Sequence, residues 1–389
     1  MSGNLAEKLI NCRRELHSHP ELSNQEFATT EKITGWLQDA GIRILPLKLE
    51  TGVVAEIGSI ASPVIALRAD IDALPIQEIS GVPFTSQHDG VMHACGHDIH
   101  TSVMLGAALL LKQQEASLSG TVRLFFQPAE ENFSGANQLI DAGALDHVAA
   151  VFGMHNAPEL PHGTFATRGG SFYAHIDRFQ ITVTGKGSHA AQPEQGIDTI
   201  VTASQIVTAL QTLPSRNFSS LESLVVSVTR IQGGNTWNVL PQTVELEGTV
   251  RTHNSQIRAQ IPETLTRVIN GIASAMGAEA SLNWYPGPPA VVNTPFWAQF
   301  SQHVAAEAGY VVQEAERQMG GEDFSLYLQH VPGVFVSIGS ASEYGLHHPR
   351  FIPDEQLIYP AASYFARLAQ QALTHLQTQH APRQTEPVE

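Results

Sequence analysis

Hydrophobic and polar positions follow two different patterns along the chain, and the first occupies residues 5 to about 174. Apolar residues at helical spacing predict helices over residues 5–16 and 25–40, and a third stretch, residues 101–112, is apolar enough to form a buried helix. Short apolar runs predict strands at residues 53–57, 64–68, 122–126 and 149–152. Helices alternating with such strands predict an α/β sheet covered by helices on both faces.

The second pattern begins near residue 175 and is typical of an α+β layer with one solvated sheet face. Apolar and polar residues alternate strictly at residues 179–184 and 244–251, with a further strand expected at 224–231 and helices at 197–213 and 255–275. From residue 295 the first pattern resumes and includes a buried strand at 334–338. We therefore predict one discontinuous domain, residues 1–174 and 295–389, with residues 175–294 inserted into it.

Composition narrows the possible functions. The chain has 389 residues, of which 42% are hydrophobic and 15% charged, so it can bury a large core and is not a disordered chain. Acidic residues outnumber basic ones by 37 to 21, and the net charge of −16 disfavours nucleic acid and anionic membranes as partners. We find no secretory signal or membrane-spanning run, and two cysteines suit a reducing compartment, so the cytoplasm is the expected location.

Potential metal ligands are concentrated in residues 92–100, MHACGHDIH. This segment supplies Cys95, His97, Asp98 and His100, and thiolate, imidazole and carboxylate are the ligand types that zinc and related metals prefer. Gly96 lets the backbone bend so that Cys95 and His97 face one centre. A buried cysteine near solvent-exposed histidines is the simpler alternative for this segment alone.

Further candidate ligands follow predicted strands. Glu130 and Glu131 come directly after the strand at 122–126, His155 ends another apolar strand, and His347 lies in the later sequence GLHHP. The glutamate pair taken alone reads as an ordinary acidic loop, but strand ends are where α/β folds place their sites. Together the candidates exceed what one tetrahedral zinc needs and suit two metals about 3.5–4 Å apart with a bridging ligand; the five are Cys95, His97, Glu131, His155 and His347.

Seven ordered motifs make the sequence resemble the aminoacylase/hippurate hydrolase amidohydrolases, especially the branch with the auxin-conjugate (indole-3-acetyl-amino acid) hydrolases. The resemblance runs over nearly the whole chain. Its motifs are LRADIDALPIQE (residues 67–78), MHACGHDIH (92–100), FFQPAEE (125–131), GMHN (153–156), GKGSHAAQP (185–193), NVLPQTVELEGTVRT (238–252) and LHHPRF (346–351).

This resemblance implies a di-zinc-exopeptidase-like mixed sheet flanked by helices, with an inserted ferredoxin-like lid domain that forms a homodimer. By motif position, Cys95 bridges two divalent ions, which zinc, manganese, cobalt or nickel could supply. His97 and His155 complete one ion site, and Glu131 and His347 complete the other. His347 is chosen over His348 because the family ligand stands two residues before the proline.

The same resemblance assigns roles to further residues. Glu130 is the implied general base, and His189 is the implied donor to the tetrahedral oxyanion, reaching across the dimer. Asn238 and Arg251 are candidates for binding the substrate carboxylate, although Arg251 could equally be an exposed strand residue. Asp70 and Asp98 are candidates for orienting the ligand histidines.

We therefore expect a cytoplasmic, metal-dependent hydrolase that cleaves the amide bond of small N-acyl amino acids such as N-acetyl or N-benzoyl derivatives. The alternatives are a dinuclear exopeptidase that cleaves dipeptides and, in another class, a metal-binding protein without catalysis. Glu130 argues against the last, because a pure metal site has no use for a second carboxylate beside Glu131. Residues 185–190 match a loose dinucleotide pattern but lack the following helix. Other histidines, including His17, are expected at the surface or in local hydrogen bonds.

Overall fold

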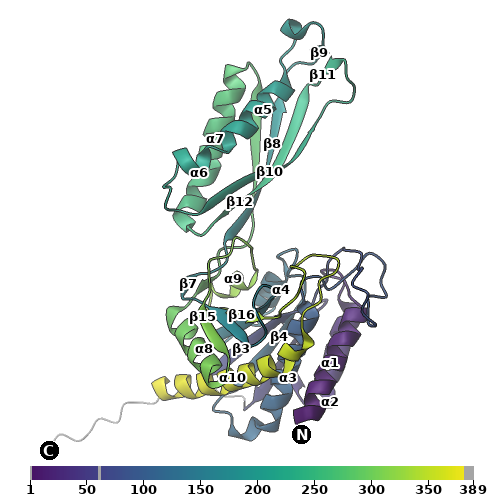
Figure 1. Ribbon diagram of the computed structural model, residues 1–389. Coiled ribbons are helices and arrows are strands. Elements are labelled where there is room, and N and C mark those ends of the chain that lie inside the picture. The colour runs from purple at the N-terminus through teal and green to yellow at the C-terminus, as the bar shows by residue number, and fades with distance from the viewer. Residues whose placement is uncertain (1, 60–62, 381–389) are drawn as a thin grey trace, which may run out of the picture. The chain divides into compact units, whose positions relative to one another are not determined.

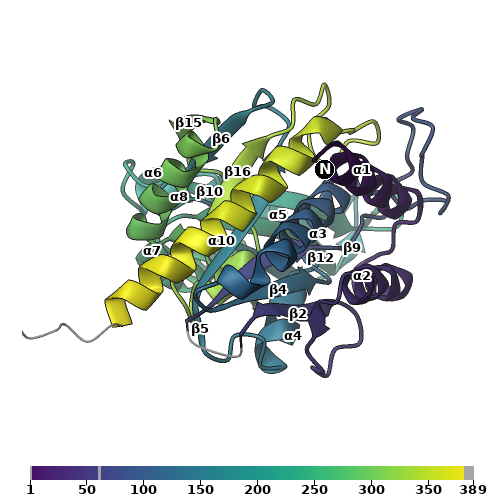
Figure 2. The ribbon, with the colours of Figure 1, turned by 90° about the horizontal axis from the view of Figure 1, so that it is seen from below.

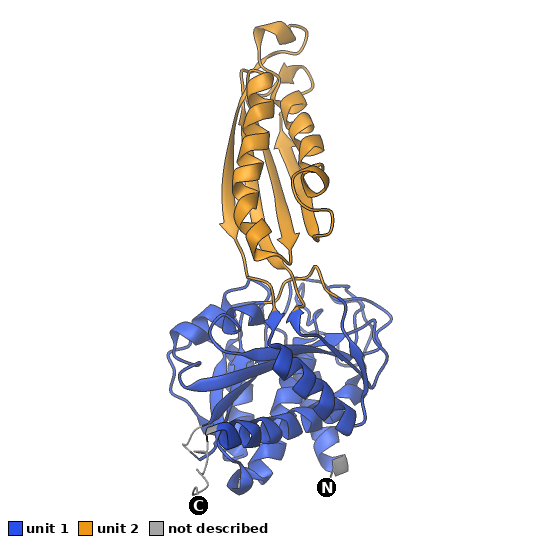
Figure 3. Cartoon of the chain, turned by 90° about the vertical axis from the view of Figure 1, so that its left-hand side faces the viewer, with its two compact units in different colours: residues 1–170, 292–316, 323–389 blue, residues 171–291, 317–322 orange. Residues whose placement is uncertain are grey.

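The computed structural model describes residues 2–59 and 63–380 (Figure 1). The chain forms two compact units, coloured separately in Figure 3. Unit 1 comprises the described residues of Met1–Gly170, Val292–Glu316 and Asp323–Glu389, and unit 2 comprises Ser171–Val291 and Arg317–Glu322. The return segment Arg317–Glu322, which belongs to unit 2, was not part of the insertion that we delimited from the sequence.

Unit 1 is built on an eight-stranded mixed sheet in the order β1-β2-β4-β3-β5-β16-β6-β15. Strand β3 runs parallel to both β4 and β5, β16 runs parallel to β5, and β2 is antiparallel to β4. The predicted mixed sheet flanked by helices is thus confirmed. The strands are β1 (Arg43–Ile44), β2 (Val53–Gly58), β3 (Val64–Asp70), β4 (Thr121–Gln127), β5 (Val148–Ala157), β6 (Thr164–Thr167), β15 (Val311–Glu314) and β16 (Gly333–Gly339).

The helices of unit 1 cover the sheet, and its central strands are buried along their whole length. Every residue of β3, β4 and β16 is buried. Helix α3 packs beside α10 and α1 on one face (Figure 2), and the short α4 and α9 contact each other on the other side of the sheet (Figure 1). The helices are α1 (Ser2–Ser18), α2 (Phe27–Asp39), α3 (His97–Gln113), α4 (Gly135–Asp141), α8 (Pro295–Glu307), α9 (Phe324–Tyr327) and α10 (Ile358–His380), with single 3₁₀ turns at Glu115–Ser117 and Glu355–Leu357.

The parallel strands β4, β3 and β5 bring their carboxyl ends to one edge of the sheet. Asp70 is the last residue of β3, Gln127 is the last of β4, and β5 carries His155 near its end. The register pairs Asp70 with Gln127. This edge therefore collects polar side chains from sequence segments that are far apart, as expected for α/β folds.

Unit 2 has a four-stranded antiparallel sheet in the order β10-β12-β8-β13, with helices α5 and α7 packed together against it. Its main elements follow one another as β-α-β-β-α-β, which is the ferredoxin-like order. The strands are β8 (His175–Thr184), β9 (Ser188–His189), β10 (Leu224–Gly233), β11 (Val239–Leu240), β12 (Thr243–Thr252) and β13 (Glu279–Pro286). The helices are α5 (Thr199–Leu210), α6 (Leu213–Arg216) and α7 (Ser255–Ala275), with a 3₁₀ turn at Pro193–Gln195.

Strand β12 shows why apolar and polar residues alternate along the strands of unit 2. Alternate side chains of β12, from Val244 to Thr252, are buried, and helices α5 and α7 pack against this strand.

Two short strands, β7 (Gly170–Ser171) and β14 (Val292–Asn293), lie where the chain passes between the units. Within residues 2–59 and 63–380, no helix is long and apolar enough to cross a membrane.

Candidate active site

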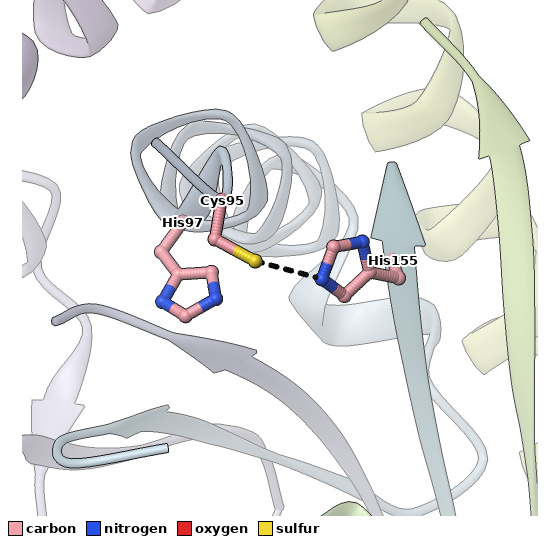
Figure 4. A group of neighbouring side chains, drawn as sticks. All are labelled: Cys95, His97 and His155. Atoms are coloured by element: carbon pink, nitrogen blue, oxygen red, sulfur yellow. Dashed lines mark hydrogen bonds between the residues drawn. The ribbon is translucent and has the colours of Figure 1, made fainter. Parts of the chain in front are cut away.

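The Cys95–Gly96–His97 turn introduces two potential metal ligands at the start of α3 (Figure 4). Gly96 is the residue before the helix and has a φ of 88°, a left-handed conformation that favours glycine. A Cβ atom at this position would meet Nδ2 of Asn156 at 2.4 Å. Both the backbone conformation and the close approach therefore require glycine between the two ligands.

His155 reaches the same place from strand β5 (Figure 4). Its Nε2 lies 3.4 Å from Sγ of Cys95, and its Nδ1 lies 2.7 Å from the carbonyl oxygen of Asn156. Because a carbonyl can only accept, Nδ1 carries the proton and donates it to that oxygen. The lone pair of Nε2 is then directed toward Cys95, as a metal-binding histidine requires.

His97 is oriented by Asp72, a residue to which we assigned no role from the sequence. Nδ1 of His97 lies 3.0 Å from the carbonyl oxygen of Asp72 and 3.1 Å from its Oδ1. The other nitrogen, Nε2, lies 3.9 Å from Oε1 of Glu131. With Nδ1 held by Asp72, Nε2 of His97 is directed toward the carboxylate of Glu131.

The donor atoms form two overlapping groups. Those of Cys95, His97 and His155 all lie within 4.8 Å of one another, and so do those of Cys95, Glu131 and His347. Cys95 belongs to both groups. His348 instead stacks on Tyr344, with ring centroids 4.5 Å apart, so the geometry favours His347 over its neighbour as a ligand.

The site fits metal ions on independent grounds. Nε2 of His97 and Oε1 of Glu131 are both buried, and neither has a hydrogen-bond partner among the described residues. Buried polar atoms without partners are costly, and two that face each other from an imidazole and a carboxylate are the donors a divalent cation needs. Sulfur, nitrogen and oxygen donors together suit zinc and the neighbouring transition metals.

The electrostatics of the site favour a cation. Burial lowers the pKa of His97, but the carboxylates of Asp70, Asp72 and Glu131 outweigh it and raise the pKa to about 10. Burial, reinforced by Glu131, Glu130 and Asp70, raises the pKa of the Cys95 thiol well above its usual value. A bound cation reverses this balance, because it stabilises a thiolate and displaces the proton from an imidazole.

Glu130 is buried beside these groups, on the turn that follows β4. One of its carboxylate oxygens lies within 4.8 Å of the donor atoms of His97 and Glu131. The turn itself is held from two sides, since the backbone N–H of Ala129 donates to Glu26 and that of Glu131 donates to Asp72. The turn thus holds the carboxylate of Glu130 next to the candidate ligand groups.

The two aspartates proposed to orient ligands lie in different surroundings. Oδ1 of Asp70 lies 2.6 Å from Nδ1 of His100, and its Oδ2 lies 3.7 Å from Nε2 of His97. Burial opposes its ionisation, but His97, His100 and Arg68 hold the pKa of Asp70 well below its usual range. Asp98 instead pairs with Arg13 and His17, so in the described part of the chain its ion-pair partners do not include a proposed ligand histidine.

The three candidates from unit 2 are not gathered at one place within that unit. His189 is exposed and lies on β9, which pairs with β11 through His189 and Val239, and the N–H of Ala190 donates to the carbonyl of Asn238. Arg251 pairs with Ile176 at the other end of the β8–β12 ladder and donates to the carbonyl of Met319. His189 and Asn238 are therefore neighbours, and Arg251 is separate from them.

Comparison with known proteins identifies the family. The family model described as peptidase family M20/M25/M40 matches residues 66–371. The chain belongs to this family. An N-acetylcysteine deacetylase of Bacillus subtilis is 50% identical over 364 residues, covering 93% of this chain and 96% of the relative.

Two further relatives of this M20-family chain are informative. An IAA-amino acid hydrolase ILR1-like 2 of Arabidopsis thaliana is 39% identical over 94% of this chain and 85% of its own length. The crystal structure of the Bacillus subtilis YXEP protein, described as a dinuclear metal binding peptidase from the M20 family, matches with a TM-score of 0.87. It is 47% identical and covers 96% of this chain and 99% of its own.

Sequence reasoning missed two features of this M20 chain. The first is Asp72, which contacts His97 and stands two residues after Asp70 in the motif LRADIDALPIQE. Its position just after the strand that ends at Asp70 was the signal in the sequence that could have identified it. His17, expected at the surface or in local hydrogen bonds, is fully buried and contacts residues 61 and 81 positions away. A local sequence pattern does not predict contacts between residues so far apart in the chain.

Proposed function

We propose that this M20-family enzyme hydrolyses the amide bond of N-acyl amino acids, with N-acetylated amino acids as the first candidates. The observation that carries the proposal is the pair of candidate ligand groups sharing Cys95, with a carboxylate oxygen of the buried Glu130 within 4.8 Å of the donor atoms of His97 and Glu131. The name of the N-acetylcysteine deacetylase, 50% identical over nearly the whole of both chains, supports the substrate class.

Cys95, His97 and His155 would hold one divalent ion, and Cys95, Glu131 and His347 the other. The description of the related YXEP protein as a dinuclear metal binding peptidase supports a pair of ions. When bound, two such ions would lower the pKa of the attacking water and would polarise the scissile carbonyl. Asp72 orients the His97 ring so that Nε2 faces the centre, and the Asn156 carbonyl does the same for His155.

Glu130 accepts the proton of the attacking water and returns it to the leaving nitrogen. The C–N bond breaks as the amine departs, and the acyl carbon keeps the oxygen delivered by water, so that a free carboxylic acid and an amino acid are released. The position of Glu130 on a turn fixed by Glu26 and Asp72 keeps its carboxylate in place through both proton transfers.

Unit 2 supplies the remaining groups in this proposal. His189, held by the β9–β11 pairing, donates to the oxyanion from the partner chain of a homodimer, with Asn238 beside it. Arg251 binds the substrate carboxylate. Dimerisation through unit 2 is supported by β10 at an edge of its sheet and by the strongly exposed Leu221 and Trp237.

The test is a hydrolysis screen on protein reconstituted separately with zinc, manganese, cobalt and nickel. N-acetyl, N-benzoyl and indole-acetyl amino acids are compared with dipeptides at equal concentration. Faster cleavage of N-acyl amino acids supports the proposal, whereas faster cleavage of dipeptides supports the exopeptidase alternative. Absence of turnover with bound metal would favour a binding protein.

The two free cysteines agree with a cytoplasmic location.

A further inference from the structure

A second cluster of ionisable side chains is buried next to the first turn of α3, and the proposed hydrolysis does not use it. Its members are Arg13 and His17 of α1, Glu78 of the segment after β3, and Asp98 of α3. Arg13, His17 and Asp98 are fully buried, and Glu78 is nearly so. Burying four ionisable groups costs free energy, so their arrangement calls for an explanation.

The contacts form a continuous chain centred on Asp98. Its Oδ2 lies 2.7 Å from Nε of Arg13 and 2.8 Å from Nδ1 of His17. The opposite ring nitrogen of His17, Nε2, lies 3.1 Å from Oε1 of Glu78. Since both ring nitrogens face carboxylate oxygens, the ring carries two protons, and Arg13 pairs in addition with Glu355, whose Oε1 lies 3.0 Å from its Nη1.

The cluster adjoins the metal centre through the backbone. Asp98 directly follows His97, and in a helix consecutive side chains point about 100° apart, so one can face the metal centre while the next faces α1. The first turn of α3 has no side-chain N-cap, and the residue before it, Gly96, has a left-handed backbone. The charged side chains of this turn pair as His97 with Asp72, His100 with Asp70, and Asp98 with Arg13 and His17, and the last of these pairings joins the turn to α1.

Buried ion clusters seldom raise stability over an apolar replacement, and their best-supported use is to specify one arrangement. We propose that Asp98, held by Arg13 and His17, is a positioning residue that fixes the first turn of α3 and thereby the place of His97 Nε2 at the metal centre. Asp72 sets the direction of the His97 ring, and the Asp98 cluster sets where its backbone lies. This inference rests on the proposed function, because it concerns the same two ions.

The experiment measures zinc affinity by competition with a chromophoric chelator, separately from activity. The variants are Asp98→Asn, His17→Gln and Glu78→Gln, which keep the shape of each side chain and remove charge or a proton site. Glu56→Gln is the matched control. Glu56, on β2, is also buried and forms ion pairs with two arginines, Arg43 and Arg123. The unfolding midpoint of the metal-free protein is recorded for each.

We expect Asp98→Asn to weaken zinc binding about 10-fold or more, the usual effect of losing a group that supports a ligand. His17→Gln should weaken it less and Glu78→Gln least, in order of distance from Asp98. Glu56→Gln should lower the unfolding midpoint without changing zinc affinity. Saturating zinc should restore most of kcat in the cluster variants with KM unchanged.

Zinc affinity within twofold of wild type in both folded Asp98→Asn and His17→Gln would overturn the inference. An equal loss of affinity in Glu56→Gln would also overturn it, because the effect would then come from general destabilisation. If Asp98→Asn does not fold, His17→Gln and Glu78→Gln decide by the same criterion. A wild-type protein that binds no zinc contradicts the proposed function instead, so the two failures are distinguishable.

Discussion

In unit 1 the side chains that we propose for catalysis are mostly buried and held by other residues of the same unit, whereas in unit 2 His189 is exposed and stands on a two-residue strand. His97, His155 and Glu130 each lie within a network that includes Asp72, Asn156 or the Glu26-bound turn. The proposed unit 1 residues are thus organised within one unit, whereas His189 in unit 2 is proposed to act on the partner chain of a homodimer.

The largest expected effect tests the unit 1 side of this comparison. Glu130→Gln keeps the size of the side chain but cannot accept a proton, so we expect kcat to fall by about 10²–10⁴-fold. Metal content, measured by elemental analysis, should stay at the wild-type level because Glu130 is not a proposed ligand. Near wild-type kcat would mean that the base is another residue.

A matched change to a proposed ligand separates binding from proton transfer. Cys95→Ser should lower the metal content after dialysis, and activity with it, because a bridging thiolate is replaced by a weaker donor. Elemental analysis of both variants side by side is the measurement. Unchanged metal stoichiometry would remove Cys95 from the ligand set.

The next effect concerns unit 2. His189→Ala should lower kcat by about 10²–10³-fold, the range found when an oxyanion donor is removed, with metal content and unfolding midpoint unchanged. Mixing and refolding Glu130→Gln with His189→Ala in equal amounts should restore about a quarter of wild-type activity, because half of the symmetric dimers are mixed and carry one intact site. Recovery of none would place His189 outside any shared site.

A smaller effect is expected at Arg251, which lies half-buried on β12 and donates to the Met319 carbonyl. Arg251→Lys keeps the charge and loses the fork, so KM for a carboxylate-bearing substrate should rise about 10-fold, given that charged hydrogen bonds contribute about 1.5–3 kcal/mol. Arg178→Lys is the control on the same sheet, where Arg178 pairs with Glu247. Equal KM changes in both variants would remove Arg251 from substrate binding.

The smallest effect is on the stability of unit 2. Burial and the charge of Arg258, whose Nη1 lies 3.1 Å away, lower the pKa of His175 to about 4. The unfolded chain takes up this proton near pH 6.5, so the unfolded state binds more protons and stability falls as pH drops from about 6.5 to 4. The protection of the β8 amides against hydrogen exchange should fall less between pH 6.5 and 4 in His175→Gln than in the wild type. An equal fall in both proteins would contradict the lowered pKa of His175.

The parts of the fold and site that follow from the sequence depend on local patterns. Continuous apolar runs predicted β3, β4 and β16, and strict alternation predicted β12, because burial on one or both faces leaves a direct trace in the sequence. The spacing in Cys-Gly-His likewise marks two ligand types around a glycine whose left-handed backbone the structure shows.

What the sequence could not supply was pairing over long separations. The strand order that places β4, β3 and β5 side by side brings Glu131 and His155 to one edge, yet no local pattern encodes that order. For the same reason the partners of Asp98 could not be foreseen, because Arg13 and His17 come from another helix. Buried charges are satisfied by partners that only the tertiary structure identifies.

The left-handed backbone of His347, with a φ of 64° and its N–H bound to the Ala94 carbonyl, presents a side chain that is 52% exposed. His97 and His155 are buried, so the two ligand groups that share Cys95 differ in depth. An ion held by Glu131 and His347 would exchange with chelators first, and the deeper one would persist. Sequential loading should therefore yield mixed-metal enzyme, with a different element in each position.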